Sequence, residues 1–285
     1  MIADWAPLNK DDSIMRIAQT FEKLRAEKRA AFIPFFAAGD PDLDTTAELI
    51  KAAVDAGADI VEIGVPFSDP IADGPVIQAA FYRALEKGFR VDPLFEMVRK
   101  LRASGLMAPL VCMVSYTLVY KKTLLSFMKA AKAAGFDGLI IPDLPAGYEG
   151  DAAERAVECG LDLVFLIAPT TTSERRDMIA KMSRGFIYYV SITGITGART
   201  VLPEDLAANV SDIKKRTALP VCVGFGISQP EQAAAVSAIA DGVIVGSALV
   251  KKVEEAGAQK LDGAALVRHV TLLAASLAQS THGKR

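Results

Sequence analysis

Histidine is scarce in this chain of 285 residues. The only two histidines, His269 and His282, both lie in its last stretch. Histidine is the usual general base of catalytic triads and the commonest metal ligand in proteins. The sequence therefore argues against most histidine-based triads and histidine metal sites, and we expect no bound metal.

Cysteine is nearly as rare. Cys112, Cys159 and Cys222 lie far apart, and no pair has the short spacing of a zinc site or a redox dithiol. They are typical of small buried side chains in a reducing compartment. The first residues are neither basic nor followed by an apolar stretch, so no secretory signal is predicted and we expect a cytoplasmic protein.

Long uncharged runs are also missing. The best candidate, residues 103–120, is interrupted by Gly105 and Pro109 and is shorter than the roughly 20 residues that a membrane span needs. The formal net charge is only −2, with acidic and basic residues interspersed. Because no basic stripe is present, neither a membrane nor a nucleic acid is an expected partner.

Apolar residues are plentiful, and they gather in short runs. Eight such runs, each followed by a plausible helix, are centred near Phe32, Val61, Val111, Leu139, Val164, Ile187, Val221 and Val243. Nearly continuous apolar runs are typical of parallel strands covered on both faces. The pattern predicts an α/β fold, a closed (β/α)8 TIM barrel. An open doubly wound sheet of two halves is the alternative, but no linker divides the chain.

The ends of the chain carry helical patterns. Ile14, Ile17, Phe21 and Leu24 recur at helical spacing and predict an added N-terminal helix, preceded by cap candidates at residues 11–13. A last helix is predicted at about residues 258–278. We expect residues 1–285 to form one barrel domain, with residues 1–10 and 280–285 poorly ordered.

Three acids mark the second run and the loop after it. Glu62 lies inside an apolar strand, where desolvation makes a charged carboxylate costly. Asp69 and Asp73 follow in a loop that contains Pro66 and Pro70. This arrangement suggests an active site, although Glu62 could instead face solvent on an exposed strand and the aspartates could simply form turns.

Glycines follow the last three runs. They occur at residues 194–197, 224–226 and 246, the last directly before Ser247. Glycine loops that lead into helix N-termini expose backbone N–H groups and are favourable phosphate sites. No apolar run contains a lysine, which argues against a Schiff-base aldolase. The chemistry that remains after these exclusions is acid–base catalysis by carboxylates on a phosphorylated substrate.

The motifs themselves resemble a known family. The segment 62–75 is similar to the signature of the tryptophan synthase alpha chain, and the similarity extends to residues 32–35, 39–41, 191–199, 224–228 and 246–247. The resemblance therefore covers the chain almost from end to end. Two stretches depart from it: residues 115–117, where many members have an aromatic pair ahead of an asparagine, and a long N-terminal segment that contains Trp5.

The resemblance implies an activity. Members cleave indole-3-glycerol phosphate to indole and glyceraldehyde 3-phosphate, a lyase reaction of tryptophan biosynthesis that needs no cofactor. Glu62 would be the catalytic acid and base, and Asp73 would hold the indole N–H. The residues that would bind substrate are Phe35 and Tyr188 at the indole, Thr196 in a lid at 191–199, and Gly197, Gly226, Gly246 and Ser247 at the phosphate.

The resemblance also implies a partner. The chain would work with a tryptophan synthase beta chain in an α2β2 heterotetramer, with Asp69 and Pro70 facing that partner. Two alternatives stay open. The barrel could act mainly as a regulatory or structural subunit that binds phosphate, or it could be a sugar-phosphate isomerase or epimerase, which the missing histidines disfavour.

Overall fold

Short parallel strands at the apolar runs form one sheet that closes on itself. The computed structural model describes residues 15–71, 73–148, 151–191, 203–224 and 226–283. The sheet order is β5-β4-β3-β2-β1-β9-β8-β7-β6, with every neighbouring pair parallel. The strands are β1 Ala31–Ala37, β2 Val61–Gly64, β3 Leu110–Met113, β4 Gly138–Ile140, β5 Asp162–Val164, β6 Leu166–Ile167, β7 Ile187–Val190, β8 Val221–Gly224 and β9 Gly242–Val245.

The closure lies at Phe165. This residue separates β5, which pairs with β4, from β6, which pairs with β7. Its carbonyl oxygen accepts a hydrogen bond of 3.2 Å from the Tyr188 amide on β7. The fifth predicted strand is therefore split in two because it changes partner part-way, and the barrel prediction is confirmed.

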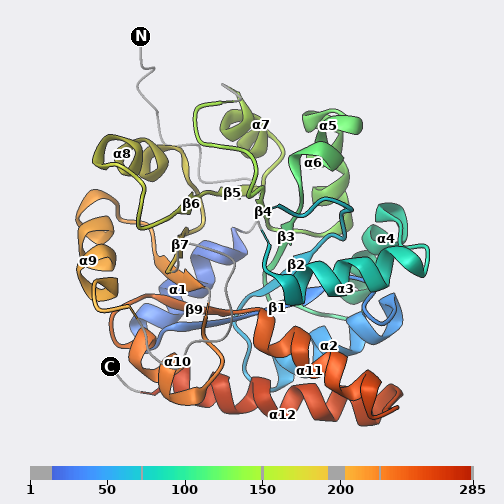
Figure 1. Ribbon diagram of the computed structural model, residues 1–285. Coiled ribbons are helices and arrows are strands. Elements are labelled where there is room, and N and C mark those ends of the chain that lie inside the picture. The colour runs from blue at the N-terminus through green and yellow to red at the C-terminus, as the bar shows by residue number, and fades with distance from the viewer. Residues whose placement is uncertain (1–14, 72, 149–150, 192–202, 225, 284–285) are drawn as a thin grey trace.

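Helices surround the ring of strands (Figure 1). None within the described ranges is long and apolar enough to cross a membrane. They are α1 Arg16–Ala26, α2 Leu43–Asp55, α3 Pro75–Glu86, α4 Val91–Ala103, α5 Tyr116–Lys121, α6 Leu124–Ala134, α7 Ala152–Glu158, α8 Ser173–Met182, α9 Leu206–Arg216, α10 Pro230–Ser237, α11 Ser247–Ala258 and α12 Gly263–Thr281.

The predicted N-terminal helix closes one end of the barrel. Ile17, Phe21 and Leu24 of α1 are buried and belong to the same apolar cluster as the barrel interior. The rings of Phe21 and Phe186 lie 6.0 Å apart, centre to centre. Because the strands start at this end, the opposite end is left open for the loops that follow them. The predicted caps at residues 11–13 lie outside the described residues.

The C-terminal predictions need correction. Helix α12 begins at Gly263 rather than at Ala258, because the chain turns after α11 through Lys260 and Gly263, both with positive φ. The expected disorder is wrong for residues 280–282. Thr281 is a buried residue of α12, and His282 Nε2 lies 2.8 Å from Asp59 Oδ2. Residues 1–10 and 284–285 are not described, and the single-domain assignment stays a prediction.

Candidate active site

Glu62 lies inside the barrel wall rather than on an exposed strand. All four residues of β2 are buried, and Glu62 is only 2% exposed. The alternative of a solvent-facing Glu62 is therefore wrong. Burial raises the pKa of its carboxyl to about 8, and repulsion from Asp73 contributes to the same shift. At neutral pH this side chain holds a proton and can act as a general acid.

Asp73 follows in the loop between β2 and α3. The Asp73 amide donates to the Pro70 carbonyl at 3.0 Å, and Gln78 Nε2 donates to the Asp73 carbonyl at 2.8 Å. These bonds fix the loop directly before α3. Burial, followed by repulsion from Asp143, raises the pKa of Asp73 to about 7. Two acids that ionise near neutral pH thus lie close enough to affect each other's ionisation.

The two rings predicted to line the indole pocket lie over glycines. Phe35 on β1 is 3% exposed, and a Cβ at Gly64 would overlap its ring. Tyr188 on β7 is 7% exposed, and a Cβ at Gly224 would overlap its hydroxyl. Burial, with repulsion from Glu62 and Asp73, raises the pKa of Tyr188 well above its usual value. The Tyr188 ring therefore lies near both acids and stays neutral.

The predicted phosphate residues are only partly described. Gly246 caps α11, and the exposed Ser247 is the first residue of that helix. A Cβ at Gly246 would lie 3.5 Å from Phe35 Cβ, so this helix N-terminus adjoins the Phe35 side chain. Gly226 has a φ of +80°, which favours glycine. Thr196 and Gly197 lie outside the described residues.

Asp143 is a neighbour of the site that the sequence analysis missed. It follows β4 and accepts hydrogen bonds from Ser115 Oγ and from the Tyr116 amide, each of 2.7 Å. It lines one small cavity together with Asp69 and Asp73. Its position directly after an apolar run was the available signal, because such positions form the catalytic face of a barrel.

Known proteins match this chain over most of its length. The family model described as "Tryptophan synthase alpha chain" matches residues 21–281. The chain belongs to this family. A tryptophan synthase alpha chain of Rhodopirellula baltica is 48% identical over 238 residues, which cover 83% of this chain and 86% of the relative. One of Synechocystis is 47% identical over 240 residues, covering 84% and 90%.

Solved structures of the same family have the same fold as this chain. A tryptophan synthase subunit alpha from Legionella pneumophila superposes with a TM-score of 0.86 at 35% identity, covering 94% of this chain and 99% of that one. A chain of Mycobacterium tuberculosis tryptophan synthase gives 0.84 at 36% identity, covering 94% and 98%. The resemblance stated from the sequence is confirmed, and the chain is a lyase of the tryptophan synthase alpha type.

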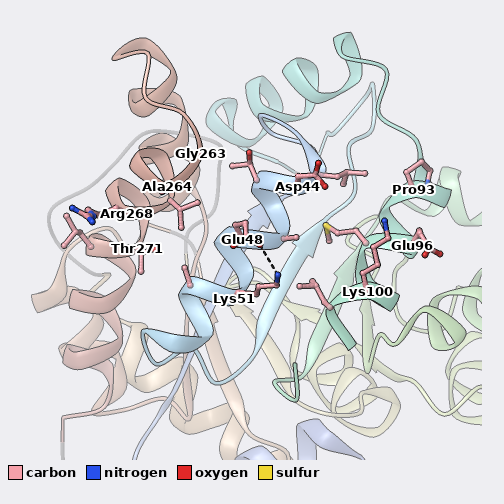
Figure 2. Close-up of a pocket in the computed structure, with 18 of the residues that line it drawn as sticks. Asp44, Glu48, Lys51, Pro93, Glu96, Lys100, Gly263, Ala264, Arg268 and Thr271 are labelled. Carbon is pink, nitrogen blue, oxygen red and sulfur yellow. Dashed lines mark hydrogen bonds and ion pairs between the residues drawn. The ribbon is translucent and has the colours of Figure 1, made fainter. Parts of the chain in front are cut away.

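A cavity on the outer wall lies away from the predicted site residues. A cavity of about 1030 Å³ lies on the outer wall between α2, α4 and α12 (Figure 2). It is lined by residues such as Glu48, Lys100 and Arg268, and by none of the predicted site residues. No cluster of candidate metal ligands occurs in the described part of the chain. The carboxyls rather than the cavity identify the catalytic end.

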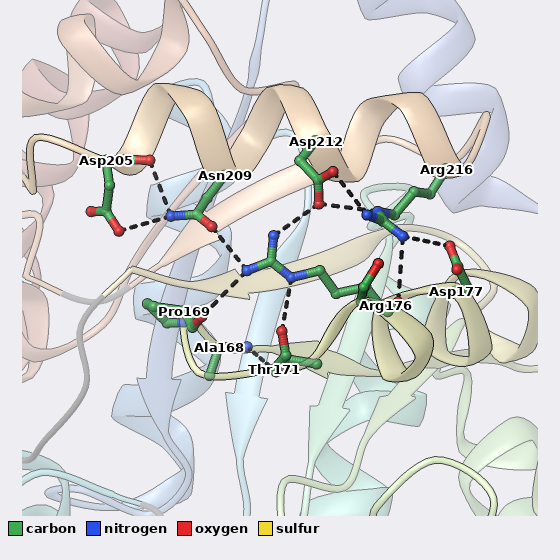
Figure 3. A network of polar contacts seen from close by, with 10 residues as sticks. Ala168, Pro169, Thr171, Arg176, Asp177, Asp205, Asn209, Asp212 and Arg216 are labelled. Carbon is green, nitrogen blue, oxygen red and sulfur yellow. Dashed lines mark hydrogen bonds and ion pairs between the residues drawn. The ribbon is translucent and has the colours of Figure 1, made fainter.

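A polar network joins the loop after β6 to helix α9 (Figure 3). The buried guanidinium of Arg176, on α8, donates to the Thr171 carbonyl at 3.1 Å, and to Asn209 Oδ1 and Asp212 Oδ2 on α9 at 2.9 Å each. Asn209 in turn donates to Asp205 at the start of α9 at 2.9 Å. The loop after β6 and the beginning of α9 are thus bonded to one side chain.

Proposed function

We infer that this chain cleaves indole-3-glycerol phosphate to indole and glyceraldehyde 3-phosphate, as the alpha subunit of tryptophan synthase. The observation that carries the inference is the buried Glu62 carboxyl beside Asp73, at the catalytic end of a barrel of this family. Both acids have pKa values near neutrality, at about 8 and about 7. Proton transfer in both directions is therefore possible at physiological pH.

We assign the proton transfers to Glu62. Its neutral carboxyl donates a proton to the indole C3, which leaves the positive charge on the ring nitrogen. The resulting carboxylate then accepts the proton of the glycerol hydroxyl next to the bond that breaks. As that C–C bond cleaves, its electron pair returns to the ring, releasing indole and the aldehyde. Glu62 ends as it began, protonated, so no external acid is consumed.

Asp73 is assigned to the charge that develops on the ring. In its ionised form it accepts the indole N–H and stabilises the positive nitrogen of the intermediate. Because the substrate's own ring takes up the electrons, this chemistry needs no Schiff-base lysine. Phe35 and Tyr188 would line the ring, while Gly226, Gly246 and Ser247, with Thr196 and Gly197, would complete the phosphate and lid contacts.

We propose that the chain pairs with a tryptophan synthase beta chain in an α2β2 heterotetramer, in the cytoplasm. Family membership implies the beta-chain partner. Large exposed side chains support a docking face at the catalytic end, namely Ile71 at 83% and Tyr148 at 82% exposure in loops, and Tyr120 at 71% in α5. Asp69 is exposed in the same region. An Asp69→Ala variant with normal activation by the beta chain would remove Asp69 from this interface.

The test of the activity is Glu62→Gln, assayed by indole release with and without beta chain. Glutamine keeps the shape of the side chain but cannot transfer the proton, so we expect at least a 100-fold loss of kcat with an unchanged circular dichroism spectrum. Glu86→Gln, an exposed position on α3, is the matched control and should retain activity. Wild-type turnover by the Glu62 variant would refute the assignment.

The alternative of a mainly regulatory or structural subunit makes a different prediction. The purified wild-type chain would then release no indole even when the beta chain is present. The presence of both Glu62 and Asp73, with shifted pKa values, argues against that outcome.

A further inference from the structure

Three carboxyl side chains lie near one another at the catalytic end, and one of them, Asp143, has no role in the proposed reaction. Glu62 comes from β2, Asp73 from the next loop, and Asp143 from the loop after β4. Glu62 and Asp73 interact electrostatically, and so do Asp73 and Asp143. Asp143 is thus linked to the proton-transfer group through Asp73.

Asp143 is held firmly in place. Ser115 Oγ donates to its Oδ2, and the Tyr116 amide donates to its Oδ1, each at 2.7 Å. Ser115 is also the N-cap of α5, accepting from the Thr117 amide at 3.3 Å. Both oxygens of the carboxylate thus meet donors, which suits the ionised form, since a carboxylate can only accept.

The space between the two aspartates is small. Asp73 and Asp143 line one cavity of about 30 Å³, together with apolar residues such as Val65, Phe81 and Met113. This volume holds little more than a water molecule. Burial is the larger cause of the raised pKa of Asp73, so a fixed carboxylate nearby acts on it through a medium less polar than bulk water.

We propose that Asp143 is a positioning residue of the alpha site: clamped by Ser115 and the Tyr116 amide, its carboxylate sets the strength with which Asp73 accepts a hydrogen bond. Among the described residues, the other ionisable groups near Asp73 are Glu62 of β2, Tyr188 of β7 and Asp69 of its own loop. All of these are acids. Repulsion from Asp143, added to burial, raises the pKa of Asp73.

The consequence for the reaction rests on the proposed function. A carboxylate with a higher proton affinity forms a stronger hydrogen bond to a donor that is becoming acidic. The indole N–H becomes acidic only when C3 has been protonated, so the benefit is greater in the transition state than in the bound substrate. Asp143 thereby increases kcat without touching the reacting atoms.

The test removes the negative charge of Asp143 and measures the ionisation of the Asp73 carboxyl directly. Asn fits the Asp143 position because the Ser115 hydroxyl can also accept a hydrogen bond. The carboxyl of Asp73 can be followed by carbon-13 NMR, and its signal is assigned by its absence in Asp73→Asn. In Asp143→Asn we expect this carboxyl to titrate roughly 0.5–1 pH unit lower than in wild type. The acid limb of kcat/KM should move in the same direction, and kcat on the plateau should fall several-fold.

Three further variants make the result decisive. Asp143→Ser removes the same charge with a smaller side chain and should reproduce the shift if the Asn variant folds poorly. Asp143→Glu keeps the charge and should restore most of the wild-type midpoint. Asp92→Asn, at an exposed carboxylate of α4 that pairs with Lys122, is the control and should change nothing.

The NMR readout needs no turnover, which separates the two hypotheses. An unchanged Asp73 midpoint in the folded Asn and Ser variants would overturn the role of Asp143, whatever the activity of Glu62→Gln. Full activity of Glu62→Gln would refute the proposed function, whatever the Asp73 midpoint.

Discussion

Glu62 lies directly beside Phe35 across the β1–β2 ladder, and both side chains are almost completely buried. The ring of Phe35 also lies against Gly64, so it covers part of the strand that carries the carboxyl. Since a carboxylate without water is unfavourable, the protonated form is preferred, and the pKa of Glu62 rises to about 8. The pairing of β1 with β2 therefore places the aromatic ring and the buried acid side by side.

This relationship predicts a pH-dependent cost in stability. In the unfolded chain Glu62 ionises near pH 4.5, whereas in the folded chain it does so near pH 8. Between these values the folded state binds the extra proton, so the free energy of unfolding decreases as the pH rises and levels off above about 8. In Glu62→Gln this contribution is absent. Denaturant unfolding at pH 5, 6.5 and 8.5 measures this contribution. From pH 5 to pH 8.5 the free energy of unfolding of the variant should rise by a few kcal/mol relative to that of wild type. A difference that stays constant with pH would contradict the prediction.

Gly224 is predicted to be required for the position of Tyr188. A Cβ at Gly224 would overlap the Tyr188 hydroxyl, so Gly224→Ala must displace the ring from the pocket. We expect KM for the substrate to rise about tenfold, with a loss of roughly 1–3 kcal/mol in stability from overpacking. Gly257→Ala is the control. Beyond the backbone of its own helix α11, no atom would lie within 4 Å of a Cβ at this position, so the variant should gain about 0.5–1 kcal/mol with unchanged kinetics.

The Arg176 network is predicted to stabilise the fold around the catalytic loops. Arg176→Met keeps the length of the buried side chain but leaves Asp212 and Asn209 without this donor. Thermal or denaturant unfolding should show a loss of about 1–3 kcal/mol. Arg175→Met, on the exposed side of the same helix, should change stability by less than about 0.5 kcal/mol. Equal losses in the two variants would show that the network contributes nothing specific.

Much of the fold could be predicted from the sequence, because apolar runs and helix ends are local features. The position of Glu62 in an apolar run suggested a buried acid, although the pattern alone left a solvent-facing side chain open. The split at Phe165 could not be predicted, because it depends on which neighbour each end of the strand meets. The proximity of Asp143 to Asp73 could not be predicted either. It joins loops some 70 positions apart, and only the closed sheet brings them together.

The C-terminal end illustrates the same limit, since composition suggested disorder and a long-range contact gives order. Asp59 Oδ2 lies 2.8 Å from His282 Nε2 and also accepts from the Phe32 amide at 2.8 Å. We expect His282→Ala to lower the free energy of unfolding by about 1 kcal/mol, and Asp59→Ala by more, because it also leaves the Phe32 amide without this acceptor.

A double-mutant cycle measures the contact itself. The double variant should lose less than the sum of the two single variants, with a coupling of at least about 0.5 kcal/mol. Gln279→Ala, at an exposed position near the end of α12, is the control for changes in the helix and should be nearly neutral. Strict additivity of the Asp59 and His282 substitutions would mean that the end of the chain is held by Thr281 and the apolar face of α12 alone.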